Sequence, residues 1–322
     1  MRQSIMEKRK LGTTNLEVGR INFGGNVFGW TLTEKESFDI LDQFIEGGYN
    51  FIDTADNYSA WVDGHVGGES ETIIGNWMKE RKNRDQIVLA TKVGGTTNTH
   101  GIDVSKKHII AACDASLKRL KTDYIDLYYT HFDNIETPIE ETLSAYQELI
   151  KAGKVRYIGA SNLSPTRLIN SIETAKKKGL PQYQVLQPHY NLIDRRQYEV
   201  NYAPLAEKYQ LAVLPYFSLA SGFLTGKYQS KEDLKNSKRS SFVKDYLNEK
   251  NFSIIKQLKE VADKYQTQPA VVALAWLLNR PNIAAPIVSA TSKEQLNTLF
   301  EAPRITIEQS DFDLLTNISR PQ

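Results

Sequence analysis

The chain has 322 residues, and its 40 lysines and arginines nearly balance its 38 aspartates and glutamates, which leaves a net charge of +2. A charge this close to zero gives no general field for nucleic acid or an anionic membrane, so we expect neither as a partner. The single cysteine excludes an internal disulfide and is typical of a reducing compartment. Cys113 continues an apolar helical stripe, which favours a core position over a reactive thiol.

No stretch of the sequence predicts export or membrane insertion. Residues 1–8 contain no apolar run of signal-peptide length, and no later segment reaches transmembrane length without charges. We therefore expect a soluble, cytoplasmic protein. Closed α/β barrels often take this many residues as one domain, and no change in composition marks a boundary. Residues 1–322 are accordingly predicted to form a single domain.

The order of predicted elements is a short β run followed by an amphipathic helix, repeated eight times. A hairpin around residues 10–18 precedes the repeat. The strands are expected at residues 20–23, 50–53, 87–92, 125–131, 155–161, 184–187, 211–217 and 284–288. Eight such units with mostly short links favour a parallel sheet covered by helices.

Capping signals mark where the helices begin. Thr33 with Glu36 predicts a capping box, and Thr137 with Glu140 predicts another, with Pro138 at the first helical position. The helices are expected at residues 33–46, 69–79, 105–120, 137–152, from 164, 198–209, 252–265, 269–278, from 292, and 307–318. The connection after the seventh strand, residues 218–250, is the long exception, with a polar stretch at 231–241.

Polar and ionisable side chains stand at the ends of strands that are spread along the whole chain. These residues are Asp53, Lys92, His131, Ser161, Gln187 and Tyr216. An open doubly wound sheet concentrates its site near one topological switch, whereas a closed barrel gathers the carboxyl ends of all its strands at one rim. We therefore predict a (β/α)8 TIM barrel, an α/β fold, with an N-terminal hairpin and extra C-terminal helices.

Several common kinds of site are absent from the sequence. The glycines from Gly24 to Gly29 do not have the spacing of a dinucleotide-binding G-x-G-x-x-G motif, and no Walker loop is present. The five histidines, at positions 65, 100, 108, 131 and 189, show no paired metal-ligand spacing. We therefore expect no metal.

The stretch from Phe51 to Tyr58 joins an apolar run to a carboxylate at its end and then to a phenol in the following loop. If the strands are parallel in one barrel, Asp53 and Tyr58 meet Lys92 and His131 at the same rim. Each residue also has an ordinary explanation. Asp53 could cap a helix, Lys92 could extend along the surface to solvent, His131 could be a hydrogen-bonded rim histidine, and Tyr58 could be an interface aromatic.

The motif Asp53-Thr54-Ala55-Asp56-Asn57-Tyr58 resembles the aldo-keto reductases, in particular a bacterial branch that is similar to potassium-channel β subunits. The resemblance covers nearly the whole chain. Further matching segments are residues 9–12, 68–75, 153–162, 187–192, 222–227 and 289–296. The resemblance implies a (β/α)8 barrel, nicotinamide-dependent carbonyl reduction, and a catalytic tetrad of Asp53, Tyr58, Lys92 and His131.

The chemistry needs these residue types. Reduction of a carbonyl leaves negative charge on its oxygen, so an acid must stand within hydrogen-bond reach. A free phenol titrates near ~10, and we expect the Lys92 ammonium to lower that pKa, while Asp53 keeps the ammonium charged. The resemblance thus implies that Tyr58 is the general acid and that His131 orients the carbonyl.

Cofactor residues also follow from the resemblance, with NADP as the expected cofactor and NAD as the alternative. Ser161, Asn162 and Gln187 are similar to a carboxamide-binding set, and Tyr216 to a ring that stacks on nicotinamide, although Tyr216 could instead be a barrel-core aromatic. Glycines in the following loop let backbone amides approach a pyrophosphate. The other implied cofactor residues are Gly24, Gly25, Asn26, Leu219, Gly222, Leu224, Lys227, Ser289, Thr291 and Gln295.

The sequence departs from the family pattern in two places. Many relatives present an arginine near the start of the last barrel helix to clamp a 2′-phosphate, and here that position is Ser292. Relatives commonly carry serine and proline after the stacking tyrosine, where this chain has Phe217-Ser218.

Aromatic residues near the rim predict a wide apolar substrate pocket for a small-molecule carbonyl compound. These are Phe28, Trp30, Trp61 and Phe132. An alternative for Trp30 and Trp61 is that they pack loops onto the barrel. Two alternative functions are a nicotinamide-binding regulatory partner with slow turnover, and a barrel hydrolase with paired carboxylates, for which a second acid at a neighbouring strand end is missing.

Overall fold

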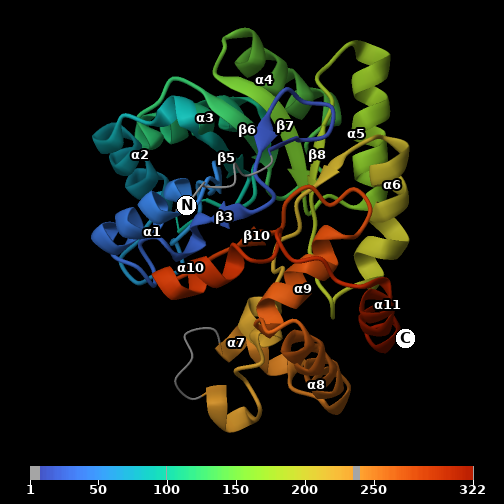
Figure 1. Cartoon of the computed structure of the whole chain (residues 1–322). Helices are drawn as coiled ribbons and strands as arrows, with labels where there is room; N and C mark the ends of the chain where they lie inside the picture. The colour runs from blue at the N-terminus through green and yellow to red at the C-terminus, as the bar shows by residue number, and fades with distance from the viewer. Residues whose placement is uncertain (1–7, 99, 235–239, 322) are drawn as a thin grey trace.

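The computed structural model describes residues 8–98, 100–234 and 240–321. Its centre is a sheet of parallel strands in the order β10-β3-β4-β5-β6-β7-β8-β9, with helices outside it (Figure 1). The strands are β3 Asn22–Gly24, β4 Phe51–Asp53, β5 Val88–Val93, β6 Ile125–Thr130, β7 Val155–Ser161, β8 Val185–Gln187, β9 Ala212–Val213 and β10 Ile287–Val288. The predicted (β/α)8 architecture is confirmed.

Backbone hydrogen bonds close the sheet into a barrel between β9 and the segment leading into β10. The amide of Val213 donates to Asn282 (3.0 Å), and the amide of Ala284 donates back to Val213 (2.9 Å). Both flanking strands are shorter than the predicted 211–217 and 284–288. Pro215 and Pro286 explain the difference, because proline cannot donate to a strand ladder.

The helices alternate with the strands as predicted. The described residues form three further α-helices, two in the long connection after β9 and one after the last barrel helix. The barrel helices are α1 Glu34–Glu46, α2 Glu69–Arg81, α3 Lys106–Leu120, α4 Ile139–Lys151, α5 Pro165–Lys178, α6 Ala203–Lys208, α9 Pro269–Leu278 and α10 Lys293–Leu299. The long connection after β9 includes η4 Ala220–Thr225, α7 Ser240–Val243 and η6 Lys244–Tyr246 before α8 Glu249–Lys264, and α11 Gln309–Ile318 is last. Residues 235–239 of the predicted polar stretch lie outside the described residues.

The helix boundaries follow local capping chemistry. Thr33 and Glu36 form the predicted capping box, and Ser105, Ser164 and Ser292 each accept a hydrogen bond from the backbone three residues later. The box predicted at Thr137 and Glu140 is wrong. Pro138 is the N-cap of α4, and the Glu140 carboxylate instead accepts a hydrogen bond from the Lys178 ammonium at 2.7 Å.

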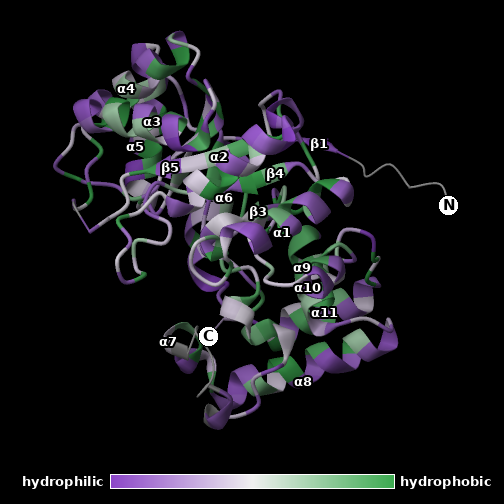
Figure 2. Cartoon of the chain, turned by 90° about the vertical axis from the view of Figure 1, so that its left-hand side faces the viewer, coloured by the Kyte–Doolittle hydropathy of each residue, from purple (hydrophilic) through white to green (hydrophobic). Residues whose placement is uncertain are grey.

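Hydropathy divides the helices into two kinds. Figure 2 shows hydrophilic and hydrophobic residues alternating along α8, as expected for a helix with one face in water. Helix α9 differs, because its residues from Ala270 to Leu278 are all buried. Among the helices of the described residues, none combines the length and the apolar composition that crossing a bilayer requires.

The amino-terminal end of the barrel is covered by the predicted hairpin, β1 Arg9–Lys10 and β2 Glu17–Val18. Leu11, Leu16 and Val18 are buried in one cluster with barrel-interior side chains such as Leu127. The amide of Asn15 also donates to the Tyr157 hydroxyl at 3.1 Å. This end of the barrel interior is therefore filled by apolar packing, and the polar residues predicted for a site lie at the carboxyl ends of the strands.

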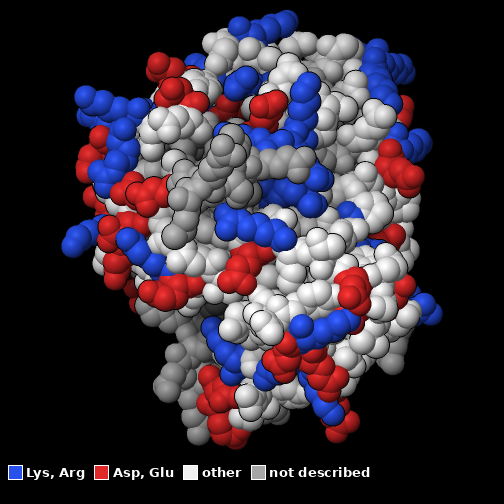
Figure 3. Space-filling view, viewed as in Figure 1, with Lys and Arg blue, Asp and Glu red and all other residues white. Residues whose placement is uncertain are grey.

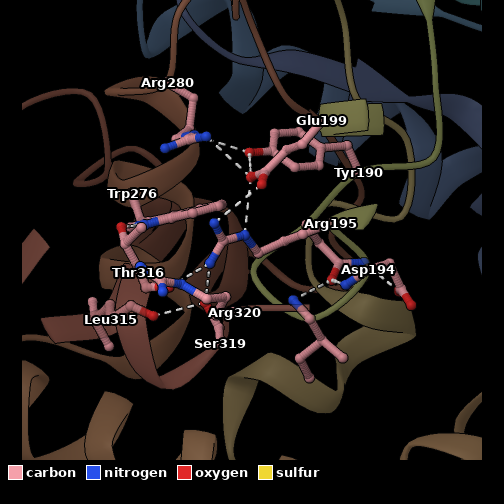
Figure 4. Close-up of polar contacts among 12 residues, drawn as sticks. Tyr190, Asp194, Arg195, Glu199, Trp276, Arg280, Leu315, Thr316, Ser319 and Arg320 are labelled. Carbon is pink, nitrogen blue, oxygen red and sulfur yellow. Dashed lines mark hydrogen bonds and ion pairs between the residues drawn. The ribbon is translucent and has the colours of Figure 1, made fainter. Parts of the chain in front are cut away.

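The C-terminal helix is fixed to the barrel by a network of charged side chains (Figure 4). Arg195 and Arg280 both contact Glu199, at 2.9 and 3.0 Å. Arg195 also donates to the carbonyl of Thr316 in α11 at 2.5 Å, and Trp276 of α9 donates to the Thr316 hydroxyl at 2.9 Å. The docking of a final helix, predicted at 307–318, is thus confirmed.

Surface charges of opposite sign are interspersed. Figure 3 shows basic and acidic side chains side by side over much of one face. Several form ion pairs, including Lys154 with Asp114 at 2.6 Å and Lys264 with Asp311 at 2.8 Å. Charged side chains on the surface are therefore partly neutralised by neighbours of opposite sign, in addition to the near-zero net charge of the whole chain.

The contact between α2 and α3 gives a test of the helix packing. A Cβ added to Gly75 would lie 2.2 Å from the carbonyl oxygen of Arg119 and 2.7 Å from the Cα of Leu120. Alanine is the better helix former by ~1 kcal/mol, but overpacking against backbone costs ~1–3 kcal/mol. We expect Gly75→Ala to lower the midpoint of thermal unfolding.

Gly101→Ala is the control, because a Cβ there meets no atom within 4 Å. Its unfolding midpoint should match the wild type. A higher midpoint for Gly75→Ala would show that α2 and α3 do not approach this closely.

Candidate active site

The carboxyl ends of β4, β5 and β6 bring three of the predicted tetrad residues to one rim. Asp53 is the last residue of β4 and pairs with Ala90, and Lys92 pairs with Tyr129 near the end of β5. His131 directly follows β6, where its amide donates to Val93 at 2.8 Å. Parallel register therefore determines which ionisable side chains are neighbours.

Lys92 is the centre of the site. Its ammonium donates hydrogen bonds to the Asp53 carboxylate, to the Thr54 carbonyl at 2.7 Å and to the Tyr58 hydroxyl at 2.9 Å. An ammonium has three donors, so all are used. The side chains of Lys92 and Asp53 are both 0 % exposed, which makes their ion pair fully buried.

His131 lies beside this cluster. Its ring centroid is 6.2 Å from that of Tyr58, and its Nδ1 is buried without a hydrogen-bond partner among the described residues. Burial, with a further contribution from the Lys92 charge, holds the pKa of His131 well below its ordinary value. A neutral imidazole with one N–H donor is the result.

The pKa values in the cluster correct one prediction. Burial raises the pKa of Tyr58 above its ordinary value, and the lowering effect of Lys92 does not outweigh it. The prediction that Lys92 lowers the pKa of Tyr58 below its ordinary value is therefore wrong. Desolvation destabilises the phenolate by more than the adjacent ammonium stabilises it. Burial alone would lower the pKa of Lys92, but Asp53 and Tyr58 raise it. At neutral pH the site holds a protonated phenol beside a charged ammonium.

Gln187 completes the surroundings of Asp53. Its amide nitrogen donates to the second carboxylate oxygen of Asp53 at 3.0 Å, and its side chain is buried. Gln187 was predicted to bind the carboxamide of the cofactor, and its contact with Asp53 was not predicted. No local signal in the sequence reports this contact, because the two residues are 134 positions apart.

Neutral polar groups line the neighbouring part of the rim. Asn162 donates to the carbonyl of His131 at 2.9 Å and accepts from the Tyr216 hydroxyl at 2.9 Å. Ser161 donates to the carbonyl of Gln187 at 2.9 Å. Asn162, Gln187 and Tyr216 also line a cavity of about 340 Å³. Amide and hydroxyl groups at such a cavity suit the carboxamide of a nicotinamide ring.

The loop after β9 contributes glycines with left-handed backbone. Gly222 has a φ of 96°, and a Cβ there would lie 3.6 Å from the Lys227 ammonium. An open backbone beside a cation suits a phosphate group. Leu224 is fully buried, so only its backbone is available to a ligand, whereas Leu219 is partly buried against the core.

Several of the predicted cofactor residues make contacts among themselves. The Ser289 hydroxyl lies within hydrogen-bond distance of the Gly24 carbonyl (2.7 Å) and the Asn26 side chain (2.6 Å). The Thr291 amide donates to Gln295 at 2.9 Å. A Cβ at Gly25 would lie 2.9 Å from the Ser70 hydroxyl, so close packing of α2 explains that glycine.

Three of the four aromatic residues predicted for a substrate pocket lie around the rim. Trp30 and Trp61 meet edge to face at 5.6 Å, and Trp61 is 50 % exposed at 6.1 Å from the Tyr58 ring. Phe132 lies 4.6 Å from the His131 ring. Phe28 is different, because it is fully buried and stacks on a core phenylalanine, so it lies beneath any pocket surface.

Asp56 is a residue to which sequence analysis gave no role. It is buried, and one carboxylate oxygen has no hydrogen-bond partner in the described part of the chain. Burial and the nearby Glu71 carboxylate raise the pKa of Asp56 to about 8. Its position three residues after Asp53 was visible, but its burial depends on the packing of α2.

Within the described ranges, no group of metal-ligating side chains is suited to a metal ion.

Comparison with known proteins assigns the chain to a family. The model of the aldo/keto reductase family matches residues 20–320. The chain belongs to the aldo/keto reductase family. It is 32% identical to the uncharacterized oxidoreductase YrpG of Bacillus subtilis over 97% of this chain and 96% of that protein.

Two other relatives show how far the similarity extends. The aldo-keto reductase YhdN of B. subtilis is 32% identical over 95% of this chain and 91% of its own length. A probable voltage-gated potassium channel subunit beta of Arabidopsis thaliana is 33% identical over 92% and 91%. The resemblance inferred from the sequence is confirmed, and with it a general oxidoreductase activity on carbonyl groups with a nicotinamide cofactor.

The buried ion pair predicts a large effect on stability. Asp53→Asn keeps the shape of the side chain but leaves the Lys92 ammonium buried without its counter-charge. Breaking a buried pair in this way costs ~3–5 kcal/mol of unfolding free energy. Urea denaturation of the variant and the wild type measures it.

Asp114→Asn is the matched control, because its ion pair with Lys154 lies at the surface. The Lys154 side chain is 36 % exposed and the Asp114 side chain 51 %. Exposed pairs contribute ~0–1 kcal/mol. Equal losses in the two variants would mean that the Asp53 pair is solvated rather than buried.

Proposed function

We propose that the chain is an NADPH-dependent reductase of aldehydes or ketones, with Tyr58 as the general acid. The observation that supports this most directly is the contact of 2.9 Å between the Lys92 ammonium and the Tyr58 hydroxyl. The phenol is protonated at neutral pH, because burial raises its pKa. A proton donor and a stabilising charge thus share one small volume at the barrel rim.

The proposed mechanism assigns a task to each residue of the cluster. A bound nicotinamide supplies the hydride. Tyr58 donates its proton to the carbonyl oxygen as negative charge develops there, and the Lys92 ammonium stabilises the phenolate that remains. Asp53 keeps Lys92 charged. His131 donates a hydrogen bond that orients the carbonyl.

Cofactor binding is proposed at the adjacent half of the rim. Ser161, Asn162 and Gln187 hold the carboxamide, and the Tyr216 ring stacks on the nicotinamide. The backbone around Gly222 and the Lys227 ammonium receive the pyrophosphate. The preference for NADPH rests on family membership, because the adenosine end offers hydroxyls from Ser289 and Thr291 in place of an arginine.

A second candidate is a nicotinamide-binding regulatory partner with slow turnover. It is favoured by the 33% identity to a probable potassium channel subunit beta. The two candidates share the cofactor site and differ in the rate of carbonyl reduction. For the reductase the expected partner is a small-molecule carbonyl substrate, and neither nucleic acid nor a membrane is expected.

Tyr58→Phe tests the assignment of the general acid. Removing only the hydroxyl should lower the rate of aldehyde reduction by about 10²–10⁴-fold. NADPH binding, titrated by quenching of protein fluorescence, should be retained and tighter than NADH binding. Tyr209→Phe, which removes a surface hydroxyl bonded to Glu173, should leave both measurements unchanged.

Two outcomes would contradict this assignment. Full turnover in Tyr58→Phe would place the acid elsewhere. Tight NADPH binding by the wild type with negligible reduction of a panel of aldehydes would favour the regulatory candidate.

Trp61→Ala tests the proposed apolar pocket. Loss of an exposed aromatic wall should lower kcat/KM for a medium-chain alkyl aldehyde about 10-fold, because apolar contacts of this size discriminate by ~1–3 kcal/mol. Reduction of a short, highly charged aldehyde should change little. A wild-type preference for charged aldehydes over alkyl ones, measured as kcat/KM, would rule out the pocket.

A further inference from the structure

Several groups converge on one carboxylate, Asp194, beside the proposed cofactor site. The Tyr246 hydroxyl donates to its Oδ2 at 2.5 Å and the Asn191 amide donates to the same oxygen at 2.8 Å. The Nε2 of His189 lies 3.0 Å from that oxygen. Burial would raise the pKa of Asp194, but His189 and Tyr246 hold it below its ordinary value, so the carboxylate is ionised.

One arm of this cluster reaches the residue proposed to stack on nicotinamide. The His189 ring lies parallel to the Tyr216 ring, with centroids 5.4 Å apart and an interplanar angle of 19°. The carbonyl of the next residue, Phe217, accepts a hydrogen bond from Asn191 at 3.0 Å. Phe217 has a left-handed φ of 52°, a strained backbone conformation that persists only when neighbouring contacts maintain it.

The other arm reaches the loop proposed to receive the pyrophosphate. The Tyr246 ring stacks on Phe223 of η4, with centroids 5.8 Å apart and an interplanar angle of 21°. Phe223 is fully buried and directly follows Gly222. The position of the Tyr246 ring therefore determines where the η4 backbone lies.

The Asp194 loop is itself rigid enough to act as a support. The side-chain oxygen of Asn191 accepts from the amides of Ile193 and Asp194, both at 2.8 Å, and Asn191 is fully buried. This is an Asx turn, in which one side chain fixes the backbone two and three residues later. Both arms thus start from a loop whose conformation is held by its own hydrogen bonds.

We propose that Asp194 is a positioning residue that couples the two halves of the nicotinamide-cofactor site. Through His189 it holds the ring of Tyr216, and through Tyr246 it holds η4 and Gly222. Asp194 is not among the residues proposed above to contact the cofactor or the reacting atoms. The inference rests on the proposed function, because Tyr216 and Gly222 are assigned there to the cofactor.

The coupling makes a specific prediction about binding and chemistry. Loss of the Tyr246 hydroxyl removes a hydrogen bond to a charged group, which should weaken NADPH binding about 10-fold or more. The hydride step at saturating NADPH should not change, because Lys92, Tyr58 and Asp53 have no contact with Tyr246 or Asp194. The expected signature is a raised KM for NADPH with an unchanged single-turnover rate.

Tyr246→Phe and Asp194→Asn are the test variants in the full-length chain. NADPH dissociation is followed by stopped-flow fluorescence after mixing the preloaded protein with an excess of NADP⁺. Single-turnover reduction of an aldehyde is then measured with NADPH bound. We expect dissociation about 10-fold faster in both variants and a reduction rate equal to wild type.

Tyr265→Phe is the matched control. Its hydroxyl donates to the Asp311 carboxylate at 2.7 Å between the α8 end and α11, so the same kind of bond is lost away from the cofactor site. NADPH dissociation should equal the wild-type rate. Thermal unfolding of all three variants distinguishes a general loss of stability from the local effect.

The outcomes separate the two proposals. Unchanged NADPH dissociation in both Tyr246→Phe and Asp194→Asn, with binding intact, overturns the role of Asp194 alone. Equally faster dissociation in Tyr265→Phe also overturns it, because the effect would then be general destabilisation. No binding of NADPH or NADH by the wild type overturns the proposed function, and the role of Asp194 with it.

Discussion

The interaction on which the site depends is the buried ion pair of Lys92 and Asp53. Removing two charges from water costs several kcal/mol per ion, so a pair with 0 % exposure persists only where hydrogen bonds satisfy both partners. Lys92 has the Thr54 carbonyl and the Tyr58 hydroxyl in addition to Asp53, and Asp53 has Gln187. The parallel register of β4, β5 and β8 around a closed barrel supplies these partners together.

Burial and charge act against each other in this cluster, and their balance determines the protonation state. Sequence reasoning considered the ammonium beside the phenol and expected a lower pKa for Tyr58. The structure adds the desolvation of the phenolate, which raises that pKa. The proposed donor therefore keeps its proton until negative charge develops on a nearby oxygen, which is when Lys92 stabilises the phenolate most.

Sequence patterns predicted the parts of the fold that depend on local chemistry. Alternating strand and helix signals, and caps such as Thr33 with Glu36, depend on neighbouring residues and were visible. The residues of the predicted tetrad were identifiable from the family resemblance together with their positions at strand ends or in the loop that follows one. The contact of Gln187 with Asp53, the burial of Phe28 and the burial of Asp56 were not visible, because long-range packing decides them. Pro215 and Pro286 were present in the sequence, but their effect on strand length was not anticipated.

The two halves of the rim are stabilised in different ways. Lys92 lies on β5, and His131 directly follows β6. These strands have six residues each and are joined by a parallel ladder. Gln187 ends β8, which has three residues, and Tyr216 lies beyond the two-residue β9. The parallel pairing continues there, because the Tyr216 amide donates to the Pro188 carbonyl at 2.9 Å and the Tyr216 carbonyl accepts from the Tyr190 amide at 3.4 Å. Side chains add a second constraint there, through the contacts of Asp194 with His189, Asn191 and Tyr246. Substitutions in the Asp194 cluster can therefore alter the support of Tyr216 without changing the β5–β6 ladder that carries Lys92.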